Sequence, residues 1–115
     1  MAFKILTARE AVSVSPSMFS IPPKAAVDKL KPGNLVSILI DFINKTTRAP
    51  QAEVVWCVVM QRTNSKLVVA VWPDPPLRKV AHHGLQAKML LNITLRHVLD
   101  IAFEPTIVKR PLQIV

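Results

Sequence analysis

The sequence predicts a single α+β domain that is mainly β: a small antiparallel barrel or bent sheet of SH3-like size with one short N-terminal helix. Its 115 residues are enough to bury one core, and 50% of them are hydrophobic whereas 19% are charged. Runs of branched residues separated by turn signals indicate strands. Neither a repeat nor a linker divides the sequence, so residues 1–115 are expected to form one domain.

The amino-terminal part is expected to hold one strand and one helix. Apolar residues within 1–10 suit a short strand, and the sequence Ser15-Pro-Ser17 predicts a turn. A short helix is predicted over 22–30, because Ser20 offers a cap and prolines suit a first helical turn. Pro32-Gly33 then ends the helix.

The middle of the chain predicts three strands. Leu35–Ile43 is rich in branched residues and too short for a solitary helix, and the polar segment 44–50 follows it as a loop. Glu53–Gln61 and Lys66–Trp72 are then expected to form a hairpin, connected by the four residues Arg62-Thr-Asn-Ser65.

The carboxyl-terminal part allows two interpretations. In residues 88–95 apolar and polar side chains alternate, which favours a strand followed by a helical turn at 96–101. A helix over 85–102 is the competing interpretation, because apolar residues also recur four positions apart. Residues 106–115 are a candidate for a last edge strand, interrupted by Pro111.

Cysteine content and hydropathy indicate a cytoplasmic protein. Cys57 is the sole cysteine, so the chain cannot form an internal disulfide, and a reducing compartment is expected. The longest uninterrupted apolar run is Val54–Met60, which is far shorter than the roughly 20 residues that a membrane-spanning helix needs.

Enzymatic activity, a metal site and a cofactor are not expected, because no set of residues with the required spacing occurs. Cys57 lies within an apolar strand, where a thiol is buried and inert. His82 and His83 are adjacent and would point to opposite sides of an extended chain, and zinc-binding spacings are lacking. The two glycines, Gly33 and Gly84, cannot form a phosphate-binding loop and are expected in turns.

Four segments follow one another in a recognisable order: Leu30-Lys-Pro-Gly-Asn-Leu-Val-Ser-Ile-Leu-Ile-Asp-Phe42, Glu53-Val-Val-Trp-Cys-Val-Val59, His83-Gly-Leu85 and Arg96-His-Val-Leu-Asp-Ile101. This order resembles a group of small bacterial domains of unknown function, the YegJ-like group, over residues 21–103. Asn34 stands where that group usually has aspartate, and Cys57 where valine is common. The resemblance implies a small β-rich domain without a settled activity.

The function predicted first is an interaction module, a bacterial or mobile-element accessory protein that binds a protein partner or self-associates. Both faces of the hairpin 53–72 are apolar, so the second face needs cover from within the domain, from a partner protein or from a homodimer. The contact surface is expected to include residues of this hairpin and of the following loop: Trp56, Trp72, Pro73, Pro75, Pro76, His82 and His83.

The alternative function is a nucleic-acid-binding accessory protein. The net charge is +8, from 15 Lys and Arg against 7 Asp and Glu, and such a field attracts phosphates. These cations are scattered singly or in pairs along the sequence, which weakens the inference. The candidate phosphate contacts lie on the hairpin and its flanking loops: Lys45, Arg48, Arg62, Lys66, Arg78 and Lys79.

Overall fold

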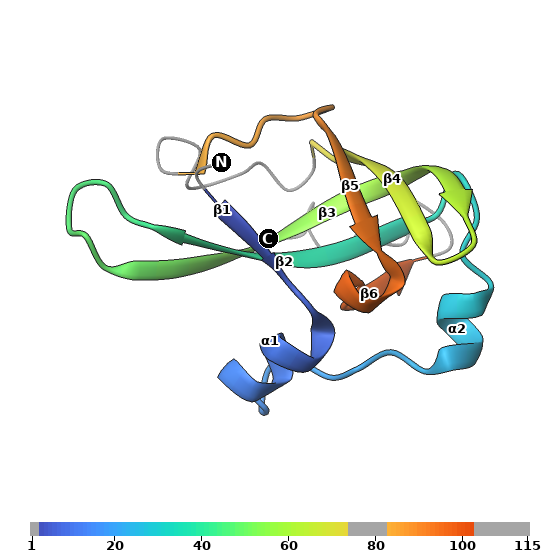
Figure 1. Cartoon of the computed structure of the whole chain (residues 1–115), viewed down its shortest axis with the longest axis horizontal. Helices are drawn as coiled ribbons and strands as arrows, with labels where there is room; N and C mark the ends of the chain where they lie inside the picture. The colour runs from blue at the N-terminus through green and yellow to red at the C-terminus, as the bar shows by residue number, and fades with distance from the viewer. Residues whose placement is uncertain (1–2, 74–82, 103–115) are drawn as a thin grey trace, which may run out of the picture.

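The computed structural model describes residues 3–73 and 83–102 of the chain. One antiparallel sheet runs in the order β1-β2-β3-β4-β5, and a sixth strand, β6, pairs with β2 (Figure 1). The sheet curls into a half-barrel; helix α1 lies beside β1 and β2, and helix α2 lies near the turn between β3 and β4 (Figure 1). The predicted fold class, mainly β with a small bent antiparallel sheet, is confirmed.

Strand β2 (Leu35–Ile43) pairs with three other strands and has the bounds that its branched residues predict. Strand β1 (Phe3–Leu6) pairs with its second half, and β6 (Asp100–Ala102) pairs with its first half. The opposite edge of β2 pairs along its whole length with β3. The strand expected within residues 1–10 is therefore confirmed as β1.

A helix that the sequence prediction lacked, α1 (Ala8–Val14), follows β1 directly. Its start is a capping box: the backbone N–H of Glu10 donates to Thr7 Oγ1 at 3.2 Å, and Glu10 Oε1 accepts from the Thr7 N–H at 2.9 Å. The buried alanines of α1 pack against Leu39 of β2. The expectation of a single helix is wrong, because these local hydrogen bonds start a helix where the apolar pattern suggested none.

The helix predicted over 22–30 is present but shorter, as α2 (Lys24–Asp28). Pro23 occupies the N-cap position and no side chain caps the helix, so the expected role of Ser20 is wrong. Both glycines have positive φ, 96° at Gly33 and 79° at Gly84, and Gly33 lies in the expected turn before β2.

Strands β3 (Pro50–Thr63) and β4 (Lys66–Val71) form the predicted hairpin. Thr63 pairs with Lys66, so the turn has two residues rather than the four that the sequence suggested. Asn64 in this turn has a φ of 53°, a conformation that asparagine adopts more readily than most residues. The register shifts between Val59 and Gln61, which indicates a β-bulge at Met60.

The strand interpretation of the carboxyl-terminal part is confirmed by β5 (Leu90–Thr94), and the helix over 85–102 is wrong. A 3-10 turn, η1 (Leu95–His97), replaces the longer helical turn expected at 96–101. The chain then turns into β6, which no sequence pattern predicted, because only its pairing with β2 makes it a strand. The candidate strand at 106–115 lies outside the described residues.

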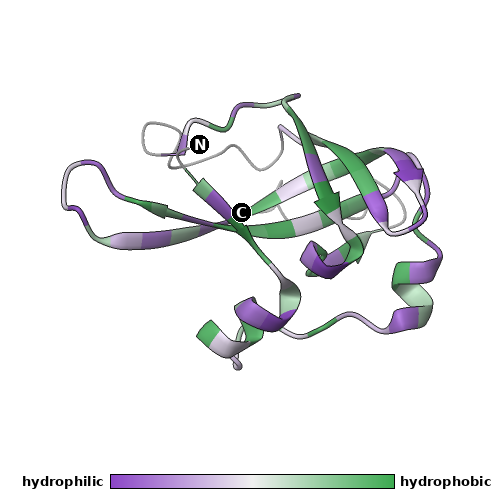
Figure 2. Cartoon of the chain, viewed as in Figure 1, coloured by the Kyte–Doolittle hydropathy of each residue, from purple (hydrophilic) through white to green (hydrophobic). Residues whose placement is uncertain are grey.

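The main core lies on the inner face of the curled sheet. Figure 2 shows hydrophobic residues concentrated along the central strands, whereas the turn between β2 and β3 is hydrophilic. Alternation places even-numbered residues of β2 and odd-numbered residues of β3 and β4 in this core, among them Val36, Ile38, Ile40, Val55, Cys57, Val59, Leu67, Val69 and Val71. Within the described parts of the chain, no helix has the length and hydrophobicity needed to cross a membrane.

Candidate functional site

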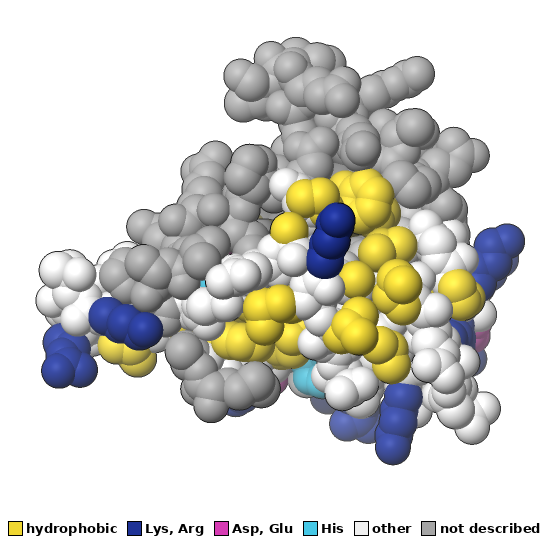
Figure 3. Space-filling model, turned by 90° about the horizontal axis from the view of Figure 1, so that it is seen from above, with side chains coloured by type: hydrophobic (Ala, Val, Ile, Leu, Met, Phe, Trp, Pro, Cys, Tyr) yellow, Lys and Arg dark blue, Asp and Glu magenta, His cyan; other side chains and the backbone are white. Residues whose placement is uncertain are grey.

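The outer face of the β3–β4 hairpin carries apolar side chains that the main core does not cover. Trp56, Val58, Val68 and Trp72 are half-buried, whereas Met60 and, on the neighbouring strand β5, Leu90 are 54% and 64% exposed. We call these six residues the outer patch. Figure 3, which views the molecule from above Figure 1, shows hydrophobic side chains gathered around one positively charged side chain. The prediction that both hairpin faces are apolar is confirmed.

Part of the outer patch rests on a small second core. Trp56, Val58 and Trp72 pack against the buried residues Leu35 and Ala102. The backbone N–H of Trp72 donates to the carbonyl oxygen of Trp56 at 2.8 Å, so the two tryptophans are held side by side on neighbouring strands. This packing fixes one end of the patch, while Met60 and Leu90 project beyond it into solvent.

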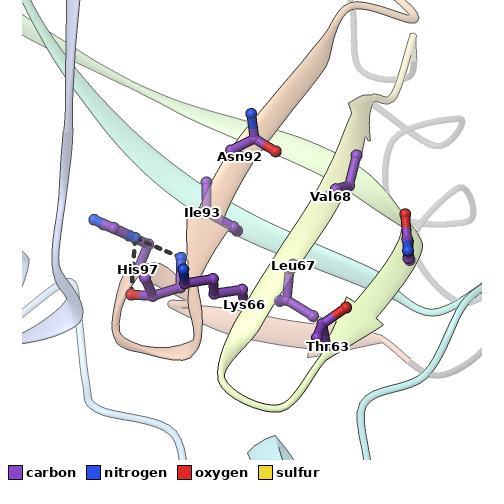
Figure 4. Close-up of a pocket in the computed structure, with 9 residues that line it drawn as sticks. Thr63, Lys66, Leu67, Val68, Asn92, Ile93 and His97 are labelled. Atoms are coloured by element: carbon purple, nitrogen blue, oxygen red, sulfur yellow. Dashed lines mark hydrogen bonds between the residues drawn. The ribbon is translucent and has the colours of Figure 1, made fainter.

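Toward the tip of the hairpin the same face becomes polar and hollow. A groove of about 550 Å³ opens there between β3, β4 and β5 (Figure 4). Register pairs Val68 with Asn92 and Lys66 with Thr94 across β4 and β5. Cationic, uncharged polar and apolar side chains line the groove without a carboxylate: Gln61, Thr63, Lys66, Leu67, Val68, Asn92, Ile93, Thr94 and His97.

His97, in η1, lies at the end of the groove (Figure 4). Its Nδ1 accepts a hydrogen bond from the backbone N–H of Thr94 at 3.0 Å and lies 3.2 Å from Thr94 Oγ1. Burial lowers the pKa of His97, although the nearby carboxylate of Glu10 opposes this shift. The ring is therefore neutral at pH 7, and its proton is on Nε2 because Nδ1 is an acceptor.

A second histidine, His83, is buried at the start of the segment that leads to β5. His83 Nδ1 accepts the backbone N–H of Leu85 at 3.0 Å, and His83 Nε2 lies 2.9 Å from Glu53 Oε1. Nδ1 is an acceptor, so Nε2 carries the proton and donates to the carboxylate. The rings of His83 and Phe42 also pack in a T-shaped arrangement, with ring centroids 5.1 Å apart. These contacts fasten the segment after residue 82 to β3 and β2.

The residues predicted to contact a partner separate into two environments. Trp56 and Trp72 lie together in the outer patch, and Pro73 is exposed directly after it. The side chain of His83 is fully buried, so it cannot form part of a contact surface. It instead links the segment that leads to β5 with Glu53 of β3. Outside the described residues lie Pro75, Pro76 and His82.

The candidate phosphate contacts do not form one patch. Lys45 and Arg48 lie in the turn between β2 and β3, whereas Arg62 near the end of β3 and Lys66 at the start of β4 lie at the opposite end of the sheet. Arg62 Nη1 donates to the carbonyl oxygens at the end of α2, those of Val27, Asp28 and Leu30, at 3.1, 3.2 and 2.9 Å. Outside the described residues lie Arg78 and Lys79.

The groove was not predicted from the sequence, although one signal for it was present. Alternation in residues 88–95 places Asn92 and Thr94 together on the polar side of a strand. Their position opposite Val68 and Lys66 follows only from the strand register.

Cys57 is buried, as its apolar neighbours predicted. Burial raises the pKa of its thiol to about 12, so the thiolate is scarcely populated near neutral pH. Among residues 3–73 and 83–102, no group of three or more His, Cys, Asp or Glu side chains is arranged to hold a metal ion.

Comparison of the chain with family models, with curated proteins and with solved structures gave no match. The resemblance to the YegJ-like group therefore stays a prediction.

Proposed function

We propose that this domain is a non-enzymatic interaction module that binds a protein partner through the outer patch. The observation that carries the proposal is the uneven cover of the β3–β4 hairpin. Its inner face is packed into the main core, whereas Met60 on its other face and Leu90 on the neighbouring strand β5 are more than half exposed. Protein interfaces commonly centre on such apolar side chains, with aromatic and methionine residues enriched.

The arrangement of the patch supports a docking role. Trp56 and Trp72 are held in place by the backbone hydrogen bond between them and by packing on Leu35. A rigid aromatic pair loses little conformational entropy on binding, so it suits the centre of an interface. The groove continues this face with hydrogen-bonding groups that can fix the orientation of a bound chain.

Site-specific photo-crosslinking in cells of the source organism tests the proposal. A photoreactive phenylalanine analogue replaces Leu90 in the patch, and Met18 serves as the matched control because it is 74% exposed and lies outside the sheet. We expect discrete protein adducts from position 90 and none of the same mass from position 18. No adduct from position 90, or the same adducts from both positions, would contradict the proposal.

Nucleic-acid binding is the second candidate function, favoured by the turn between β2 and β3. This turn projects beyond the body of the sheet and carries Lys45 and Arg48 (Figure 1). Asn44 organises it: its Oδ1 accepts the backbone N–H groups of Thr46 and Thr47 at 2.9 and 3.0 Å. A preformed basic turn on a β-ribbon can lie against phosphates.

A gel shift on duplex and single-stranded DNA at several salt concentrations tests this second candidate. Phosphate binding predicts an affinity that falls steeply with salt and that decreases in the Arg48→Ala variant. An exposed lysine away from this turn, at the end of α2, provides the control as Lys29→Ala. No shift at low salt would eliminate the nucleic-acid candidate.

A further inference from the structure

Strand β5 ends the sheet in the order β1-β2-β3-β4-β5. Directly before and directly after this strand, odd-numbered residues form backbone hydrogen bonds to β4 or to the turn between β3 and β4. The Val71 N–H donates to the Met89 carbonyl oxygen at 2.8 Å, and the Leu95 N–H donates to the Ser65 carbonyl oxygen at 2.9 Å. Alternate residues of a strand direct their backbone groups to opposite sides. Leu90, Asn92 and Thr94 therefore point their N–H and C=O groups away from β4.

The hydrogen bond to His97 gives independent evidence of this direction. The N–H of Thr94 is not directed at β4 but at His97 Nδ1, which accepts it at 3.0 Å. His97 thus satisfies the outward N–H of Thr94, the last residue of the strand. For the outward backbone groups of Leu90 and Asn92, the described parts of the chain provide no hydrogen-bond partner. Among residues 3–73 and 83–102, the edge of β5 is therefore open at these two positions.

This edge lacks the features that usually prevent strand pairing. Within Leu90–Thr94 there is neither a proline nor a charged residue. The side chain of Leu90 is 64% exposed, and Asn92 lines the groove. An added strand would therefore find unsatisfied backbone groups beside an apolar side chain and a polar groove.

Charge decides between possible occupants of the edge. Lys66 lines the groove and Lys88 is exposed just before β5, whereas no carboxylate lines the groove. A second copy of the chain carries the same net charge of +8 and would be repelled. A segment with carboxylates would be attracted to both lysines, because complementary charge favours encounter and register.

We infer that the open edge of β5 binds an extended, acidic segment of a partner protein, which pairs as an additional strand and directs side chains into the groove. The inference rests on the proposed function and adds the mode of binding and the chemistry of the partner. The outward N–H and C=O groups of Leu90 and Asn92 supply the backbone hydrogen bonds, and Lys66 and Lys88 select for acidic side chains.

Peptide binding to the purified chain tests the inference. The probe is a fluorescent peptide of alternating valine and glutamate, about eight residues long to match a typical strand. Its partner probe has lysine in place of glutamate. We expect the acidic peptide to bind and the basic peptide to bind at least about tenfold more weakly, in fluorescence anisotropy at low salt. Equal affinity for both peptides, or no binding of the acidic peptide, would overturn the inference.

Two substitutions at one position test the backbone contact. Asn92→Pro removes an N–H that faces away from β4, so the sheet keeps its internal hydrogen bonds. Asn92→Ala removes the side chain but keeps that N–H. We expect the proline variant to lose at least about tenfold in affinity and the alanine variant less than about threefold. A folded proline variant that binds the acidic peptide like the wild type would overturn the inference.

Hydrogen exchange on the wild-type chain makes the test independent of whether the proline variant folds. The acidic peptide should slow exchange of the Leu90 and Asn92 amides, and unchanged exchange at saturation would overturn the inference. Protection of the same amides by a DNA oligonucleotide but not by the peptide would also overturn it, in favour of a phosphate ligand. If the peptide fails while position 90 still forms protein adducts in cells, the strand-addition inference fails and the proposed function stands.

Discussion

His97 Nδ1 lies 3.0 Å from the backbone nitrogen of Thr94 and accepts its hydrogen bond. This contact joins η1 to the last residue of β5. It also satisfies one N–H group that points away from β4, on a strand edge that is otherwise open among the described residues. An imidazole that caps a backbone donor both stabilises the turn and limits where a further strand could pair.

The first prediction concerns this cap. His97→Ala should lower the free energy of unfolding by about 1 kcal/mol, because the Thr94 N–H loses its acceptor. Equilibrium unfolding in urea measures the loss, and amide exchange at Thr94 should become faster. His97→Asn offers a side-chain oxygen near the same place and should recover part of the stability. Equal stability of the alanine variant and the wild type would contradict the role assigned to His97.

The second prediction is a dependence of stability on pH. Burial holds the pKa of His97 in the folded protein below the ordinary value of 6.5. The unfolded chain therefore binds more protons as the pH falls through 6.5, and the contribution of His97 to stability decreases toward lower pH.

Comparison with His97→Asn isolates this contribution from that of the other histidines. The free energy of unfolding, measured in urea between about pH 8 and pH 5, should fall less steeply in the variant than in the wild type. An identical slope in the two proteins would show that His97 does not contribute to the pH dependence.

The third prediction concerns the buried contact between His83 and Glu53. Glu53→Ala leaves the Nε2–H of His83 without its acceptor in a fully buried position and should cost about 1–3 kcal/mol of stability. Glu53→Gln keeps a side-chain oxygen and should cost less. Thermal unfolding of the two variants measures the difference, and equal losses would argue against the assigned hydrogen bond.

The fourth prediction separates two cations of the hairpin. Arg62→Ala should destabilise the domain by about 1–2 kcal/mol, because the carbonyl groups at the end of α2 lose a charged donor. Lys66→Ala, at an exposed position of the same hairpin, should change stability by less than about 0.5 kcal/mol. Similar effects of the two substitutions in urea unfolding would contradict the structural role of Arg62.

The central strands could be predicted from the sequence because their pattern is local. Leu35–Ile43 is confirmed with the expected bounds, since a short branched run between polar segments is compatible with few other structures. Helix α1 was missed because Val12 and Val14 suggest extended chain, whereas the hydrogen bonds between Thr7 and Glu10 start a helix. The turn residues Asn64 and Ser65 are fewer than expected because the strands pair up to Thr63 and Lys66.

The candidate site depends on contacts between distant parts of the chain, which no local pattern shows. The burial of His83 depends on Glu53, 30 positions earlier in the sequence. The groove depends on the register that sets Asn92 opposite Val68. The outer patch could be foreseen in part, because two apolar faces on one hairpin already require cover on both sides.

The chemical nature of the adduct formed at position 90 tests the central claim most directly. A photoreactive residue at this position, activated in cells and followed by purification under denaturing conditions, captures whatever lies against the outer patch. The account predicts an adduct that protease removes and nuclease leaves intact, with acidic sequence in the crosslinked peptide. An adduct removed by nuclease, or no adduct from a folded variant, would contradict protein binding at the outer patch.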